Sequence, residues 1–482
     1  MIIHVNFLPK PGESGIGEVI AALFALVDRG RLDPEALPHL RLHLDWIQYR
    51  ANFREAVTVR HATDARGERI ALAELAVDLR RTRPERLLDE LGQALASVGP
   101  SGRETRDGVV LEDWTSLGES AIWRFNRLFW QRLSDWERQS GRGFEAALPS
   151  GRSDAHDPAS VADAVADFWT LLVELDKRGQ RPAEIFALEI GVGSGTRAGL
   201  WLDRFKAIDE ARATGFYPRL RFLLADYSMP ALDRAMSAVA AHQAVVSMIA
   251  LDALNPLRAL SFLRYKILYV HLTNVYDNLA VDELVRRDGR LYLVEARAYL
   301  PGQVARTVAA AHGLDPSALR ATVERLLEAG PDLFGDRERG VSFWRAVWDG
   351  LCLEERLRLV EGSADVPLPA GLHGEDLEEL LETAPADIRF HLSRGAVESF
   401  MNTVPLLHPR GYLQVQDIFV ATMDEYRQGF RGPGKLDGSV VNWVNGALLR
   451  VVGARAGYDV HFAPFRYRPG SRTTILYTTL RE

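Results

Sequence analysis

The stretch Ala187-Leu188-Glu189-Ile190-Gly191-Val192-Gly193-Ser194-Gly195-Thr196 decides the fold. It joins an apolar run that begins at Ile185 to a helical pattern over Thr196–Ala213. An apolar strand, glycines at alternate positions and a helix are the arrangement in which a nucleotide-type ligand lies over the end of a strand. Glycine lets the backbone approach such a ligand because it has no Cβ. The stretch therefore predicts a ligand site in an α/β domain.

Strand–helix units continue on both sides of this stretch. Further strands are expected at Leu220–Asp226, Ala244–Ala250, Lys266–Leu272, Tyr412–Ile418, Tyr458–Phe465 and Thr473–Thr479. Apolar strands that alternate with helices are typical of a parallel sheet covered on both faces. Pro469-Gly470 suits a hairpin between the last two strands. We expect a Rossmann-like α/β sheet of seven strands whose last hairpin is antiparallel.

The other parts of the chain predict additions to this sheet. We expect an N-terminal α+β region at residues 1–158 and a sheet domain in two parts, at residues 159–299 and 389–482. Between the two parts, residues 300–388 are expected to form a helical insertion that caps the site. Within the insertion the pattern predicts helices over Ala305–Ala311, Pro316–Leu327 and Trp344–Leu359. A turn-rich loop over residues 141–158 precedes the sheet domain, and Asp157-Pro158 predicts the start of a helix.

Composition limits the classes of protein. The 482 residues are 47% hydrophobic and 26% charged, with a net charge of −7, which is ordinary for a globular protein and gives no basic field for nucleic acid or an anionic membrane. One cysteine, Cys352, allows no intrachain disulfide and fits a reducing cytoplasm. No apolar run is long enough to cross a bilayer, and no secretory signal pattern is present at the N-terminus. His39 and His43 do not form an H-E-x-x-H site, so no metal is expected.

An aromatic cluster precedes the predicted sheet. Trp123, Phe129, Trp130 and Trp136 recur at spacings that fit one face of a helix. Two interpretations stay open, which are core packing and an aromatic wall over a substrate pocket.

A second candidate ligand position follows the second predicted strand. Asp226 ends that strand, and an ionised carboxylate there can accept hydrogen bonds from two ribose hydroxyls. Tyr227, the next residue, could stack on a base. The alternative role for Asp226 is a helix cap together with Ser228.

The glycine pattern separates two cofactor classes. A dinucleotide fingerprint, G-x-G-x-x-G, would need glycine at position 196, where this chain has threonine. The pattern E-x-G-x-G-x-G-T instead resembles the first motif of class I S-adenosylmethionine-dependent methyltransferases. The resemblance implies that Gly191, Gly193, Gly195 and the adjoining Thr196 hold the cofactor's amino-acid end and that Glu189 holds its ammonium. It also implies that Asp252, with Ala253, binds the adenine amino group after the third strand.

A narrower resemblance covers about residues 184–298 and 389–482. The segment Asn274-Val275-Tyr276-Asp277-Asn278-Leu279-Ala280 is similar to a motif of the MidA-type family in which Asn-Glu is followed by Asp-Ala-Leu-Pro, and the mitochondrial members of that family methylate a protein arginine in a complex I subunit. Asn274, Asp277 and Leu279 match that pattern. Val275, Asn278 and Ala280 replace its Glu, Ala and Pro, so the acceptor is expected to differ.

The fourth predicted strand carries the candidate catalytic residues, since in the superfamily its end faces the methyl group. Asp277 and Tyr276 are candidates for contact with the acceptor, Asn274 for a hydrogen bond to it, and His271 for a base. The alternatives are a helix cap for Asp277, core packing for Tyr276 and a structural strand histidine for His271.

The sequence thus predicts a cytoplasmic methyltransferase that uses S-adenosyl-L-methionine on a protein or peptide side chain or a small metabolite. We expect no nucleic acid or membrane partner, and a homodimer stays open. The alternatives are a non-catalytic assembly or scaffolding protein with a retained cofactor fold, and a nicotinamide-dependent oxidoreductase.

Overall fold

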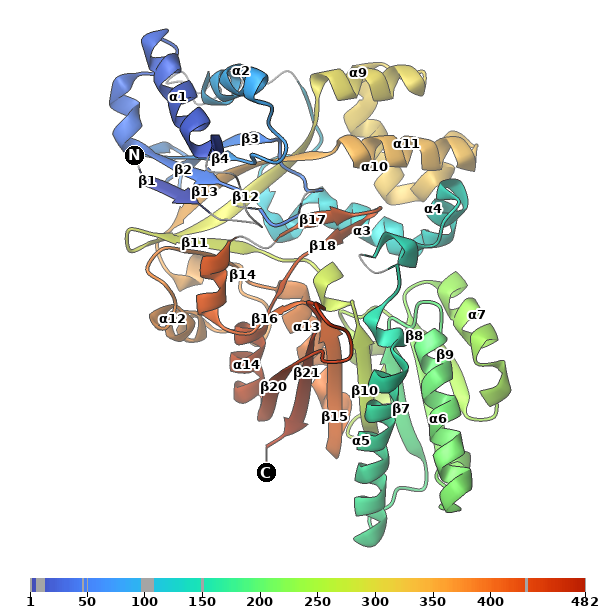
Figure 1. Cartoon of the computed structure of the whole chain (residues 1–482). Helices are drawn as coiled ribbons and strands as arrows, with labels where there is room; N and C mark the ends of the chain where they lie inside the picture. Colours follow the sequence, from blue (N-terminus) through green and yellow to red (C-terminus); the bar gives the residue numbers. More distant parts are fainter. Residues whose placement is uncertain are drawn as a thin grey trace.

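Two lobes, each built on one large sheet, make up the molecule (Figure 1). The computed structural model describes residues 2–5, 14–45, 47–49, 51–96, 108–148, 151–429 and 432–481. The lower lobe in Figure 1 holds a seven-stranded sheet, and the upper lobe holds a larger sheet that combines N-terminal strands with strands from the middle of the chain.

The seven-stranded sheet has the predicted Rossmann-like form. Its strands are β7 (Ile185–Ile190), β8 (Leu220–Asp226), β9 (Val246–Ala250), β10 (Ile267–Thr273), β15 (Leu407–Asp417), β20 (Tyr458–Pro464) and β21 (Thr474–Leu480). The spatial order is β9-β8-β7-β10-β15-β21-β20. The neighbours among β9, β8, β7, β10 and β15 pair in parallel, and β21 is antiparallel to both β15 and β20. The prediction of seven strands with an antiparallel last hairpin is confirmed.

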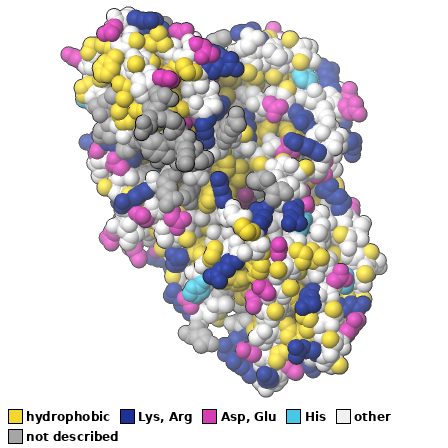
Figure 2. Space-filling view, viewed as in Figure 1, with side chains coloured by type: hydrophobic (Ala, Val, Ile, Leu, Met, Phe, Trp, Pro, Cys, Tyr) yellow, Lys and Arg dark blue, Asp and Glu magenta, His cyan; other side chains and the backbone are white. Residues whose placement is uncertain are grey.

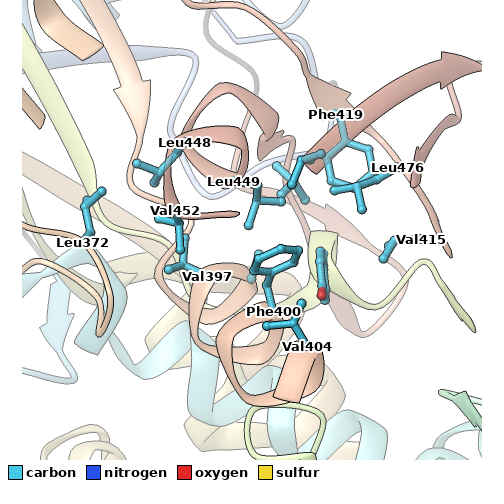
Figure 3. Packing of buried hydrophobic residues seen from close by; sticks show 14 of the residues in the cluster. Leu372, Val397, Phe400, Val404, Val415, Phe419, Leu448, Leu449, Val452 and Leu476 are labelled. Atoms are coloured by element: carbon cyan, nitrogen blue, oxygen red, sulfur yellow. The ribbon is translucent and has the colours of Figure 1, made fainter. Parts of the chain in front are cut away.

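Helices cover both faces of this sheet, as continuous apolar strands require. On one face lie α5 (Pro158–Lys177), α6 (Thr196–Arg212) and α7 (Met229–Ala238), and on the other α8 (Pro256–Leu260), α13 (Arg394–Thr403) and α14 (Gly446–Arg455). Figure 3 shows how Val397 and Phe400 of α13 meet Leu449 and Val452 of α14. Asp157 caps α5 as predicted, since its carboxylate accepts the backbone N–H groups of Ala159 and Ser160.

The second sheet combines strands from the predicted N-terminal region, the predicted sheet domain and the predicted insertion. Its main order is β1-β2-β4-β3-β13-β12-β11-β14, and β5 and β6 pair with β12. The bounds are β1 (Ile2–Val5), β2 (Leu40–Leu44), β3 (Val57–Thr63), β4 (Arg69–Val77), β5 (Gly108–Val110), β6 (Thr115–Ser116), β11 (Glu283–Arg287), β12 (Arg290–Pro301), β13 (Cys352–Val360) and β14 (Ile388–His391). The pairing of β11 and β12 with this sheet does not follow the predicted division at residues 299/300.

One prediction for the insertion is wrong. We expected a helix over Trp344–Leu359, but α11 (Arg337–Gly350) ends before β13, which lies at the centre of the second sheet. In β13 every second residue from Leu353 to Leu357 is buried, which is the period of a strand. The buried member at the centre is Glu355, so the alternation of apolar residues is broken in the sequence.

The remaining helices pack on the second sheet and between the lobes. They are α1 (Ser14–Asp28), α2 (Pro84–Ala96), α3 (Ala121–Gln131), α4 (Leu133–Ser140), α9 (Gly302–Ala311), α10 (Leu319–Ala329) and α12 (Gly374–Glu382), and two short ladders join β16 (Phe419–Val420) to β19 (Val444–Asn445) and β17 (Gly434–Leu436) to β18 (Ser439–Val441). None of the described helices is long and apolar enough to span a membrane. On the face in Figure 2, cationic and anionic side chains are interspersed over both lobes.

Candidate functional site

A cavity of about 280 Å³ opens at the carboxyl edge of the seven-stranded sheet. The strand order reverses between β7 and β10, and ligands of open α/β sheets bind at the carboxyl ends of the strands beside such a reversal. Segments after β7, β8, β9 and β10 line the cavity from one side, and α3 with the loop after α4 lines it from the other. The structure brings these predicted site residues together in its wall: Glu189, Gly191, Gly193, Asp226, Tyr227, Asp252, Ala253 and Asn274.

The three glycines after β7 share a left-handed backbone but differ in their surroundings. Their φ angles are +76° at Gly191, +55° at Gly193 and +77° at Gly195. A Cβ at Gly193 would meet nothing within 4 Å, so this backbone is open to the cavity. A Cβ at Gly195 would lie 2.6 Å from Cα of Ala235, so Gly195 allows α6 and α7 to pack closely. Neither Gly195 nor Thr196 lines the cavity.

Glu189 is buried beside a cation. Arg197 of α6 donates from Nη1 to Oε2 of Glu189 at 2.8 Å, and the guanidinium is buried as well. Burial raises the pKa of Glu189, and Arg197 opposes that rise. Arg197 is the second residue of α6 and was not predicted as a site residue, although an arginine eight residues after a strand-end acid is the available signal.

The two acids after β8 and β9 both bind backbone N–H groups. Asp226 accepts the N–H of Gly193 at 3.3 Å and that of Ser228 at 2.9 Å, and burial raises its pKa. Asp252 accepts the N–H of Leu254 at 2.9 Å and is exposed. Gly193 is thus hydrogen-bonded to the carboxylate that follows the next strand, and both belong to one rim of the cavity.

The loop after α4 closes the cavity over the glycine turn. Ser194 donates to Glu145 Oε1 at 3.1 Å, and Glu145 Oε2 lies 3.5 Å from Nδ1 of His156. Glu145 and His156 both line the cavity. The sequence showed this segment only as turn chemistry, because no spacing connects it to the glycine turn. Pro149 and Ser150, within the predicted loop, lie outside the described residues.

The aromatic cluster divides between the two interpretations left open above. Trp123 and Trp130 of α3 line the cavity, while Phe129 and Trp136 are buried in the core of the upper lobe. Asn126 of α3 donates to the backbone oxygen of Asn278 at 2.6 Å. These contacts attach α3 to the segment after β10.

The segment after β10 presents amides to the cavity. Asn274 has a φ of +51°, a conformation that asparagine tolerates better than most residues, and it lines the cavity together with Asn278. The side chain of Asn278 donates to Asp277 Oδ1 at 2.7 Å and to the backbone oxygen of Asn274 at 3.1 Å. Asp277 itself lies behind this wall, and Oδ2 of Asp417 accepts its backbone N–H at 3.3 Å.

Three of the predicted catalytic residues do not line the cavity. Tyr276 is in the hydrophobic core, and Asp277 is buried beside Asp417. His271 is buried within the sheet, 2.9 Å from Gln414 Oε1 and 2.7 Å from Thr273 Oγ1, and burial holds its pKa well below the usual value. Tyr276 thus packs in the core and His271 is a buried strand histidine, which are the alternatives given for them above. Asp277 lies behind Asn278. Among the described residues, no group of three or more potential ligands forms a metal site.

No protein-family model and no curated protein matches this chain. Among solved structures, a COG1565 superfamily protein from Burkholderia thailandensis bound to S-adenosylhomocysteine is similar to this chain. The match covers 76% of this chain and 88% of that protein, with 12% identity and a TM-score of 0.44. The carbon methyltransferase CurJ matches 75% of this chain over 68% of its own (12% identity, TM-score 0.30). The match to the methyltransferase CalH, in complex with S-adenosylhomocysteine, covers 62% of this chain and 52% of CalH (12% identity, TM-score 0.28).

Proposed function

We propose that this protein is an S-adenosylmethionine-dependent methyltransferase. The observation that carries the proposal is the acidic rim at the reversal of strand order, where the carboxyl groups of Glu145, Asp226 and Asp252, with Glu189 paired to Arg197, line one cavity beside an open glycine turn. A rim of this kind attracts a ligand with ammonium and sulfonium charges and repels the pyrophosphate of a dinucleotide. The absent third glycine at Thr196 disfavours the nicotinamide cofactor for an independent reason.

The chemistry of the rim suits the parts of this cofactor. We assign the ribose hydroxyls to Asp226, because a carboxylate accepts two hydrogen bonds, and the adenine amino group to Asp252 with Ala253. Gly191 and Gly193 allow the amino-acid end close to the backbone, with its ammonium near Glu189 and Glu145. Gly195 and Thr196 support this turn from behind. When bound, S-adenosylmethionine supplies an electrophilic methyl group that passes to a nucleophilic atom of the acceptor and leaves S-adenosylhomocysteine.

The chain's own contribution is to hold the acceptor and to exclude water. Trp123 and Trp130 bring apolar surface to the side opposite the glycine turn, and Asn274 and Asn278 bring hydrogen-bonding groups. Orientation and desolvation supply much of the rate when the electrophile is already activated. Asp277 fixes the amide of Asn278 and is a positioning residue in this proposal. The acceptor is a protein or peptide side chain or a small molecule.

Gly193→Arg tests the cofactor site. A Cβ at Gly193 meets no protein atom within 4 Å, so the arginine side chain would occupy the cavity itself. The affinity for S-adenosylhomocysteine, measured by equilibrium dialysis, is therefore expected to fall at least 50-fold. Gly215→Arg is the matched control, because Gly215 has a φ of +69°, is exposed, meets nothing within 4 Å and does not line the cavity. Equal affinity in folded Gly193→Arg and Gly215→Arg proteins would reject the assigned site. A wild-type protein that binds no cofactor would favour the scaffolding alternative.

A further inference from the structure

The end of the cavity formed by α3 and the segment after β10 differs in chemistry from the acidic rim. We infer that this end takes an acceptor with a flat aromatic ring and an anionic group, and that Arg127 binds the anionic group while Trp123 and Trp130 contact the ring. The inference rests on the methyltransferase function proposed above and specifies the acceptor class for the same site.

One face of α3 forms this end of the cavity. Trp123, Asn126, Arg127 and Trp130 all line it, and their spacings of three, four and seven place them on one side of a helix. Arg127 lies between the two tryptophans along that face. The arrangement is therefore a cation between two aromatic rings on a rigid element.

The two tryptophans offer ring surface and no hydrogen bond to a ligand. Nε1 of Trp123 donates to the backbone oxygen of Leu117 at 2.9 Å, and Nε1 of Trp130 donates to Oδ1 of Asn278 at 3.2 Å. Phe144 packs edge-on against Trp130 with ring centroids 4.8 Å apart and also lines the cavity. With both indole N–H groups used and the rings fixed, the complementary ligand is a flat apolar ring.

Arg127 is exposed, and its side chain forms no ion pair or hydrogen bond with any residue in the described part of the chain. Its neighbour Arg124, on the same helix, pairs with Glu324 at 2.9 Å. The other arginine of the cavity, Arg197, is neutralised by Glu189. A guanidinium with five donors and no protein partner in the wall of a cavity fits a carboxylate or another planar anion.

Among the residues that the structure describes, no carboxylate pairs with Arg127 at this end. Of the four acids that line the cavity, Glu189 and Asp226 lie at the ends of β7 and β8, Asp252 follows β9, and Glu145 binds Ser194 of the glycine turn. The residues from the segment after β10 that line it are neutral: Thr273, Asn274, Val275, Asn278, Leu279 and Ala280. A cationic acceptor such as a guanidinium would meet Arg127 there with no opposing charge, whereas an anionic acceptor would gain a partner.

Three probes of one shape test the inference. 2-Naphthoate, 2-naphthamide and 2-naphthylmethylammonium are titrated calorimetrically into wild-type protein, Arg127→Gln and Arg124→Gln, each with saturating S-adenosylhomocysteine. We expect the naphthoate to bind wild type at least tenfold more tightly than the amide, and the ammonium probe to bind most weakly. Arg127→Gln is expected to lose at least tenfold in affinity for naphthoate and to keep its affinity for the amide within twofold. Arg124→Gln is expected to behave as wild type.

Naphthoate that binds Arg127→Gln as well as wild type, or an ammonium probe that binds most tightly, would overturn the inference. Failure of the proposed function gives a different result, because S-adenosylhomocysteine binding is measured first in each protein. Loss of that binding in wild type rejects the methyltransferase, while naphthoate binding that depends on Arg127 would still support an anion site on α3.

Discussion

Two buried aspartates lie directly behind the wall of the cavity. Oδ2 of Asp417 accepts the backbone N–H of Tyr276 at 2.9 Å and that of Asp277 at 3.3 Å. Burial raises the pKa of Asp417 to about 7, and burial together with the nearby Asp417 raises the pKa of Asp277 well above its usual value. The two carboxyl groups therefore retain at least part of a proton at neutral pH.

This pair predicts how stability changes with pH. Since the folded-state pKa values are above the unfolded value of about 3.9, the folded state binds more protons between about pH 4 and pH 7, and the free energy of unfolding falls as pH rises. The slope reaches about 1.4 kcal/mol per pH unit for each proton. Asp277→Asn should reduce this slope in urea unfolding measured from pH 4 to pH 8, and Asp233→Asn, at an exposed position, should not. An unchanged slope in Asp277→Asn would contradict the account of the pair.

The sequence located strand-end residues better than residues that reach the cavity from elsewhere. Glu189, Asp226 and Asp252 could be predicted because the ends of parallel strands meet at one edge of a sheet. Glu145 and Arg127 belong to segments that precede the sheet, and only tertiary packing brings them there. The position of His271, away from the cavity wall, could not be predicted for a different reason. Side chains alternate along a strand, and the sequence does not show that the His271 side chain is buried within hydrogen-bond distance of Gln414 and Thr273.

At the level of elements, β13 shows how a buried charge hides the alternating apolar pattern of a strand. Glu355 of β13 is buried and pairs with three arginines from other elements: Arg54 at 2.8 Å, Arg60 at 3.3 Å and Arg389 at 3.2 Å. A charged residue in the middle of Cys352–Val360 resembles the polar face of a helix, so the segment was predicted as one. The strand forms because its charge is paired across the sheet.

Glu355→Ala should destabilise the protein strongly. Removal of one member of a buried ionic cluster leaves uncompensated charge, at a cost of about 3–5 kcal/mol. We expect a loss of that size in the free energy of unfolding from urea titration. Glu324→Ala removes the half-exposed partner of Arg124, where an ion pair contributes about 1 kcal/mol or less. Similar losses in the two variants would show that the Glu355 cluster contributes little.

At the scale of the whole molecule, the site depends on both lobes. The seven-stranded sheet supplies the glycine turn and the acids, and α3 of the upper lobe supplies the tryptophans and Arg127. The two lobes are tied by Asn126, which donates to Asn278 and accepts the N–H of Val440 at 2.9 Å. The Rossmann-like sheet could be predicted from local apolar runs, whereas the second sheet could not, because it pairs strands more than 200 residues apart, such as β3 and β13.

In the proposed function, the acidic rim and the glycine turn together bind S-adenosylmethionine. Calorimetric titration of the wild-type protein with S-adenosylmethionine, beside NADH under the same conditions, tests it most directly. We expect saturable one-to-one binding of S-adenosylmethionine, with a dissociation constant in the micromolar range, and no heat of binding with NADH. Binding of NADH alone, or of neither compound, would contradict it.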